Sequence, residues 1–209
     1  LRGPLLTDPV EAISGHRLDE YAAIAAAAGV EVSGRPSFPT AAATPALPPG
    51  AVLMLPLSAS GETVEWQGFR ALADRLTRAG RAPVFAAGPG QDAALAVIAG
   101  PHAVLAALPL AELAAAAVAC EAVVGNDSGL THLAAAARRA AHTAVHAVHV
   151  VCGSTSPART AAPGATAHVR RPPPDCWPCY RKRCDIGVPC LDISVTTVLS
   201  AILGEDQGV

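Results

Sequence analysis

The segment NDSGLTH, residues 126–132, has the composition of an oxyanion site. Asp127, Ser128 and Gly129 lead into a predicted helix, and His132 follows Ser128 by four positions, so that the two share a helix face. The free amides and positive dipole end of a helix N-terminus attract anions, and glycine lets an anion approach the backbone. The alternative is an ordinary helix whose first turn is capped by Asp127 or Ser128. Spacing alone leaves both interpretations open.

Three further segments place small polar or glycine residues where predicted strands end: residues 58–61 (SASG), 88–90 (GPG) and 153–157 (GSTSP). The carboxyl ends of parallel strands meet at one edge of a sheet, where ligands bind in folds of this class. We therefore expect Ser58 and Thr155 to lie at the same edge as the 126–132 segment.

Four of the six cysteines fall within fifteen residues: Cys176, Cys179, Cys184 and Cys190. Four thiolates suit a tetrahedral zinc or iron ion, which would hold the tail without taking part in catalysis. Reduced thiols or occasional disulfides are the alternative. Three histidines, His142, His146 and His149, also form a cluster in sequence, but we interpret them as core or surface residues.

The elements that must position these residues alternate regularly. Strands are predicted at 51–57, 82–87, 102–107, 121–125 and 144–151, and helices at 66–79, 92–99, 110–120 and 128–139. The strands are continuous apolar runs, as expected for parallel strands buried on both faces. The sequence therefore predicts an α/β fold with a Rossmann-like, doubly wound parallel sheet.

The N-terminal quarter differs in composition from the rest. A helix is predicted over 16–30, ended by Gly29, and residues 31–50 contain five prolines. We interpret residues 1–50 as the last helix of a preceding domain plus a linker, and 51–209 as a ligand-binding domain with a cysteine-rich tail at 172–192. Because the chain begins with leucine, we expect it to be a fragment of a longer protein.

Composition excludes several functional classes. The net charge is −2 and there is no basic stripe, which argues against nucleic-acid binding. No apolar run reaches the roughly 18 residues of a membrane span, and the N-terminus lacks the apolar segment of a signal peptide. We expect a cytoplasmic protein, with peripheral attachment to the inner membrane as the alternative location.

Five ordered motifs resemble glycosyltransferase family 9, the ADP-heptose:lipopolysaccharide heptosyltransferases. NDSGLTHLAAA is similar to the family's GNDSG–H–A segment. The others, in order along the chain, are LPLSASGETVEWQGFRALADRL, VFAAGPGQD, VVCGSTSPARTAAP and CWPCYRKRC with the closing helix. The resemblance runs from about residue 51 to the end, and residues 17–30 resemble the last helix of the preceding domain.

The resemblance implies the C-terminal, donor-binding half of a GT-B architecture. By this match a nucleotide-diphosphate sugar such as ADP-heptose would be bound by Ser58, Asp127, Ser128, Gly129, His132 and Thr155. Transfer in such enzymes requires no cofactor, since amides and hydroxyls stabilise the leaving diphosphate. The acceptor would be a lipopolysaccharide core or a similar glycolipid. The catalytic base is unknown and would belong to an N-terminal acceptor-binding domain or a partner chain, so we expect this chain alone to be inactive.

One position departs from the family pattern. The family usually has a lysine directly before the tryptophan, whereas this chain has Glu65 before Trp66. A carboxylate at that position would repel a diphosphate. Two alternatives to the lipopolysaccharide enzyme therefore stay open: an autotransporter-type glycosyltransferase that modifies protein, and a catalytically silent binding or assembly module.

Overall fold

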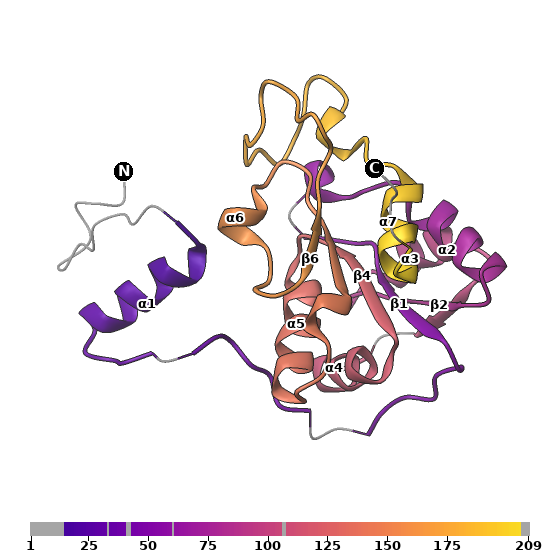
Figure 1. The fold of residues 1–209 in the computed structure, drawn as a ribbon, viewed down its shortest axis with the longest axis horizontal. Helices are drawn as coiled ribbons and strands as arrows, with labels where there is room; N and C mark the ends of the chain where they lie inside the picture. The colour runs from indigo at the N-terminus through magenta and orange to yellow at the C-terminus, as the bar shows by residue number, and fades with distance from the viewer. Residues whose placement is uncertain (1–14, 33, 41–42, 60, 106–107, 206–209) are drawn as a thin grey trace.

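A six-stranded, fully parallel sheet forms the centre of the molecule in the computed structural model, which describes residues 15–32, 34–40, 43–59, 61–105 and 108–205. The strand order is β3-β2-β1-β4-β5-β6 (Figure 1). The strands are β1 Ala51–Leu55, β2 Ala82–Ala86, β3 Ala103–Leu105, β4 Ala122–Asn126, β5 Val148–Val151 and β6 Thr166–His168. This is the order of a doubly wound Rossmann-like sheet, so the predicted fold class is confirmed.

The central strand β1 is buried on both faces because its side chains alternate between two hydrophobic clusters. Leu53 and Leu55 belong to one cluster, and Val52 and Met54 belong to the other. Leu53 is paired with Val84 of β2 and with Val123 of β4. A strand that packs on both faces has no polar side, which explains the unbroken apolar run in the sequence.

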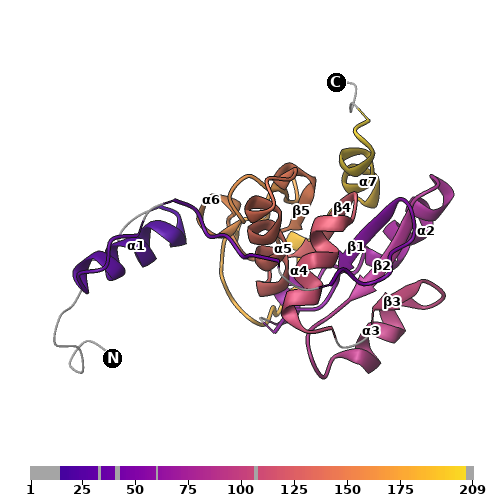
Figure 2. The same ribbon diagram turned by 90° about the horizontal axis from the view of Figure 1, so that it is seen from below.

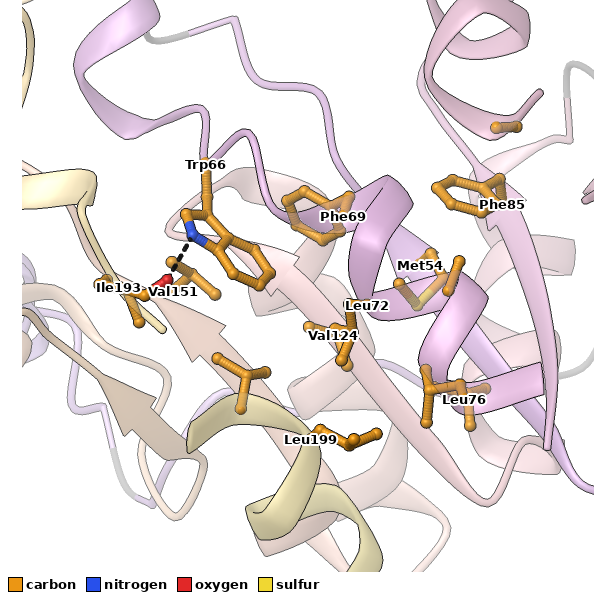
Figure 3. Close-up of a cluster of buried hydrophobic side chains, with 14 of the residues drawn as sticks. Met54, Trp66, Phe69, Leu72, Leu76, Phe85, Val124, Val151, Ile193 and Leu199 are labelled. Carbon is orange, nitrogen blue, oxygen red and sulfur yellow. Dashed lines mark hydrogen bonds between the residues drawn. The ribbon is translucent and has the colours of Figure 1, made fainter. Parts of the chain in front are cut away.

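One face of the sheet is covered by α2 (Phe69–Arg78), α3 (Asp92–Ala99) and α7 (Val195–Leu203). Its cluster includes the large side chains Met54, Phe69 and Phe85 (Figure 3). Trp66 precedes α2, and its indole Nε1 donates a hydrogen bond of 3.1 Å to the carbonyl of Ile193 (Figure 3). Trp66 is therefore a packing residue that connects the start of α2 with the segment before α7.

The other face is packed with alanine. The helices α4 (Leu110–Ala119) and α5 (Gly129–Ala140) contribute the buried residues Ala114, Ala117, Ala134 and others to this layer. Small side chains let these helices approach each other and the sheet closely. At Gly125 of β4, an added Cβ would lie 2.1 Å from the hydroxyl of Thr131. Only glycine permits this contact, which brings the first turn of α5 directly against the end of β4.

The helix α1 (Arg17–Ala27) projects beyond α5 and α6 (Pro157–Thr160), at the side opposite β2 (Figures 1 and 2). It has no buried residue, and the described residues between α1 and β1 are mostly exposed. Hydrogen bonds fix its start: His16 Nε2 lies 2.9 Å from the carbonyl oxygen of Ala161, and Arg159 pairs with Glu20. The predicted helix at 16–30 is thus confirmed with a slightly earlier end.

Several predicted boundaries were wrong. The helix predicted at 66–79 begins only at Phe69, because Trp66 turns into the core. The strand predicted at 144–151 begins at Val148, and residues Val145–Ala147 form a 3-10 turn. The short elements β6 and α6 were not predicted at all. Among the described helices, none combines the length and hydropathy that a membrane crossing requires.

Candidate functional site

The NDSGLTH segment lies where the strand order of the sheet reverses. The strands β1 and β4 are neighbours at the centre, and their chains leave in opposite directions to the two halves of the sheet. A crevice forms outside the carboxyl ends of strands at such a switch point. Asn126 joins the two strand ends: its side chain donates to the carbonyl of Pro56 at 2.6 Å and accepts from the amide of Trp66 at 3.0 Å.

A cavity of about 470 Å³ opens beside this point. Its size is within the range of about 300–1,000 Å³ that is typical of small-molecule sites. Five of the six residues predicted to bind a donor line this cavity: Asp127, Ser128, Gly129, His132 and Thr155. The structure therefore brings together residues 28 positions apart in the sequence, from the start of α5 and from the segment after β5.

The carboxylate of Asp127 connects the walls of the cavity. One oxygen lies 3.0 Å from His132 Nε2, and the other accepts hydrogen bonds of 2.6 Å from the hydroxyls of Thr155 and Thr160. Burial by itself raises the pKa of Asp127, but the hydrogen bonds from His132, Thr155 and Thr160 outweigh it and the pKa lies below its ordinary value. An ionised Asp127 requires a proton on His132 Nε2 and leaves Nδ1 of that ring for another partner.

The N-terminus of α5 is not capped by a side chain. Ser128 occupies the N-cap position, but its side chain makes no capping hydrogen bond; its hydroxyl lies 3.4 Å from that of Thr131. The alternative interpretation, in which Asp127 or Ser128 caps the helix, is therefore not supported, because Ser128 makes no capping hydrogen bond and Asp127 is engaged by His132, Thr155 and Thr160. The first amides of α5, at Gly129, Leu130 and Thr131, are therefore available to donate hydrogen bonds to an anion.

Gly129 leaves this helix end open. A Cβ added there would meet no heavy atom within 4 Å. The fold therefore does not require glycine at this position for packing. The space next to the first amides of α5 is available to a ligand.

The opposite wall of the cavity comes from α1 and the segment after it. His16, Arg17 and Tyr21 line the cavity there, and Arg139 of α5 donates to the carbonyl of Pro36 at 2.8 Å. The lining contains two arginines and a single carboxylate, that of Asp127. The cavity thus has a positive balance, which favours an anionic ligand.

Ser58 does not line this cavity. It follows β1 at the same sheet edge, but its amide donates to the Glu65 carboxylate at 2.9 Å. This contact shows where the departure from the family pattern lies: Glu65 engages the loop after β1 and is not among the cavity-lining residues. The structure therefore separates Ser58 from the five other predicted residues.

The predicted metal centre at Cys176, Cys179, Cys184 and Cys190 is not supported. Among the described residues, no three His, Cys, Asp or Glu side chains are arranged to hold a metal ion. All four thiols are free. Cys190 lies in the hydrophobic core, where burial raises the pKa of its thiol, whereas Cys176 is exposed; Cys184 Sγ accepts from the amide of Val188 at 3.3 Å. The close spacing of the four cysteines in the sequence does not correspond to a group of thiols that could hold a metal ion in the described residues.

The interpretation of the histidines as core or surface residues is confirmed. His149 is buried and its Nδ1 lies 3.1 Å from Nε2 of the buried His168, with the two rings stacked. His142 and His146 are exposed. Within the described part of the chain, none of these rings belongs to a group that could hold a metal.

The sequence did not indicate the other residues of the cavity, among them Tyr21, Arg139 and Thr160. Thr160 lies in the short helix α6, and nothing in its local sequence indicates that it contacts Asp127, 33 positions earlier. Tyr21 and Arg139 line one cavity because contacts of His16 with Ala161 and of Glu20 with Arg159 hold α1 beside it. These are contacts between distant segments that local sequence patterns do not indicate.

Replacing Thr160 by valine is expected to raise the pKa of Asp127 and to lower the free energy of unfolding by about 1 kcal/mol. The variant removes one short hydrogen bond to a carboxylate while keeping the side-chain volume. A carboxyl titration by NMR and a denaturant melt measure the two effects. Thr77→Val is the control, because Thr77 donates only to the neutral carbonyl of Ala73. An unchanged Asp127 titration in Thr160→Val would contradict the hydrogen-bond network.

The chain belongs to glycosyltransferase family 9 (heptosyltransferase), whose family model matches residues 23–188. The match begins within α1 and ends in the cysteine-rich tail, so it contains the whole sheet and the cavity residues that follow α1, but not His16, Arg17, Leu18 and Tyr21. The resemblance inferred from five motifs is thereby confirmed. No curated protein matched the sequence.

Solved structures show the same fold. The chain is similar to the E. coli ADP-heptose lps heptosyltransferase II, with a TM-score of 0.57 and 19% identity over 98% of this chain and 55% of that one. It is also similar to the E. coli heptosyltransferase WaaC solved with ADP, with a TM-score of 0.56 and 19% identity over 75% and 44% of the two chains. A family 9 glycosyl transferase from Veillonella parvula gives 0.56 and 19% over 74% and 45%. The chain spans about half the length of these structures.

Proposed function

We propose that this chain is the donor-binding part of a sugar transferase and that the cavity beside α5 binds a nucleoside diphosphate sugar. The observation that supports this most is the uncapped N-terminus of α5, which opens into a cavity with two arginines and His132. A diphosphate would accept hydrogen bonds from the amides that follow Ser128, and the dipole of α5 would favour its charge.

Each cavity residue has a distinct role in this proposal. Gly129 admits the diphosphate, and His132 donates to it from Nδ1 when the ring is charged. Asp127 is a positioning residue, since it orients His132 and fixes Thr155 and Thr160. The proposal includes no contact between the donor and Ser58, because Ser58 does not line the cavity. The proposal requires no metal, because the amides of α5 and the two arginines of the cavity would neutralise the charge of the leaving diphosphate.

The nucleotide that we propose is ADP, with an ADP-heptose-like sugar as the full donor. The support is that a solved heptosyltransferase of the same fold contains ADP. The reaction would be a displacement at the anomeric carbon of the sugar, in which the diphosphate leaves with the bonding electron pair. The acceptor would be a lipopolysaccharide core or a similar glycolipid.

We further propose the division of the chain into residues 51–209, which form the donor-binding domain, and residues 1–50, which connect it to an acceptor-binding partner. The exposed apolar side chains of Tyr21 and Ile24 on α1 support a contact with further protein at that helix. Because α1 also lines the cavity, such a partner would lie beside the donor. A catalytic base would come from that partner.

A silent binding module is the second candidate, favoured by Glu65 at the position where the family has lysine. Calorimetry with ADP, UDP and GDP at millimolar concentration tests the shared donor-binding claim. We expect ADP to bind. Absence of heat with all three nucleotides would contradict donor binding by this chain. If sugar transfer occurs after an acceptor-domain partner is added, the chain is part of an enzyme. If no transfer occurs, the chain is a silent binding module.

A further inference from the structure

A second concentration of charge lies in the segment that follows β6. Residues 170–183 contain five of the chain's 15 lysines and arginines and one acidic residue, Asp175. The chain as a whole has a slight excess of acidic residues. The basic residues of this segment are therefore a local feature that the general composition does not explain.

Two of these residues, Arg170 and Arg171, line a hollow of about 250 Å³. We call it the Arg171 hollow; its other polar or aromatic lining residues are Ser156 and Trp177, and the remainder are Pro157, Ala158, Val169 and Pro173. It has no acidic lining residue. A neighbouring hollow shares Arg170 and Arg171 but also contains Asp192, whose carboxylate lies 3.8 Å from Arg170 Nε. Of the two hollows, only the neighbouring one has a carboxylate beside the arginines, so the positive charge of Arg170 and Arg171 is not neutralised by a lining residue of the Arg171 hollow.

The walls of the Arg171 hollow are fixed by hydrogen bonds to the backbone. The indole Nε1 of Trp177 donates to the carbonyl of Gly153 at 2.9 Å, and the ring packs partly against the hydrophobic core. Arg170 Nη1 donates to the carbonyl of Pro172 at 2.8 Å. Arg171, by contrast, is exposed, and within the described residues its guanidinium has no hydrogen bond or ion pair. One rigid aromatic wall and one guanidinium available to a ligand therefore meet in the same hollow.

We propose that the Arg171 hollow binds an anionic sugar, that is, a sugar unit that carries a phosphate or carboxylate group. A guanidinium pairs with either anion through two parallel hydrogen bonds, and an indole ring offers a flat apolar surface to the C–H face of a sugar. The volume is below the range of about 300 Å³ and more that is usual for larger ligands. The hollow therefore fits a single sugar unit and not a nucleotide.

The hollow lies next to the donor cavity along the chain. Thr155 and Thr160 line the donor cavity, and residues Ser156, Pro157 and Ala158 between them line the Arg171 hollow. A sugar bound at Arg171 would consequently lie beside the donor across one short segment. That this sugar is part of the acceptor rests on the proposed function, whereas anion binding by Arg171 does not.

Titration of the chain with glucose 6-phosphate, inorganic phosphate and glucose, followed by NMR, tests the proposal. Glucose 6-phosphate is expected to bind more tightly than inorganic phosphate, and glucose is expected not to bind. Arg171→Gln is expected to weaken the binding of glucose 6-phosphate by about tenfold, since it removes a charge-assisted bidentate pair. Arg181→Gln is the matched control, because it removes the same charge from the exposed part of the same segment but does not line the hollow.

Three results would overturn the proposal: no binding of glucose 6-phosphate, equal weakening by Arg171→Gln and Arg181→Gln, or equal affinity for inorganic phosphate. The second would show a diffuse basic surface, and the third would show an anion site without sugar recognition. A Gly129→Val variant separates this inference from the proposed function. It is expected to weaken ADP binding while it keeps the binding of glucose 6-phosphate. If the wild-type protein binds glucose 6-phosphate but not ADP, the proposed donor cavity is refuted and the Arg171 hollow is not.

Discussion

Acidification from pH 7.5 to pH 5 is expected to lower the free energy of unfolding by on the order of 4 kcal/mol through the buried pair His149 and His168. Burial, together with smaller contributions from charge repulsion by His168, His146 and Arg138, lowers the pKa of His149 to about 3. Burial lowers the pKa of His168 to about 4. Both rings are therefore neutral in the folded protein at pH 5.

The sign follows from proton uptake. An unfolded histidine has a pKa near 6.5, so between pH 6.5 and pH 4 the unfolded chain binds more protons than the folded chain. Stability is therefore fully present above pH 6.5 and falls as the pH falls. At pH 5 each ring contributes a loss of about 2 kcal/mol, which is 1.5 pH units at about 1.4 kcal/mol per unit.

Denaturant melts of the wild type and of His149→Leu across this pH range measure the effect. The variant is expected to lose about half of the pH dependence, whatever its stability at pH 7.5. His146→Gln is the control, because it removes an exposed ring from the same segment. If His149→Leu and the wild type lose the same stability on acidification, the buried pair is not the cause.

Replacing Gly129 by valine is expected to weaken ADP binding by about 1–3 kcal/mol, roughly 5- to 150-fold. The branched side chain would occupy the open space beside the first amides of α5, where the diphosphate would bind. Because an added Cβ meets no atom within 4 Å, the fold is expected to tolerate the change. His132→Ala is expected to weaken binding as well, since it removes a polar ring from the cavity wall.

Thermal melts with and without ADP report stability and binding together for these variants. Ala93→Val is the matched control: it places valine in the first turn of α3 at an exposed position outside the cavity. The control should keep the full stabilisation by ADP. Equal stabilisation of Gly129→Val, His132→Ala and wild type would show that the NDSGLTH segment begins a helix and binds no nucleotide.

The sequence predicted the sheet well because buried parallel strands are continuous apolar runs. Ala51–Leu55 carries that signal over five residues, and Ala122–Asn126 carries it over its first three, Ala122, Val123 and Val124. The strand Thr166–His168 has three residues and two polar side chains, so it carries none. It forms because its backbone pairs with β5 and its histidine pairs with His149. Those are tertiary interactions that local patterns do not encode.

The candidate site could be predicted only in part, for a similar reason. Residues of a single short motif, such as Ser128, Gly129 and His132, lie close together in any fold in which a helix begins at that motif. The contact of Thr160 with Asp127 and the wall formed by Tyr21 depend on how distant segments pack. Ser58 does not line the cavity and its amide donates to the carboxylate of Glu65, a contact that spacing cannot indicate; its part in donor binding stays a prediction.

A crystal structure of the chain with ADP would show whether the nucleotide binds at the start of α5. We expect the diphosphate in the cavity beside α5, with its oxygens within hydrogen-bond distance of the amides that follow Ser128 and of His132. The adenosine should lie within the same cavity, on the side lined by α1 residues such as Arg17 and Tyr21. ADP bound at another part of the sheet edge, for example beside Ser58, with the first amides of α5 unoccupied, would contradict the account.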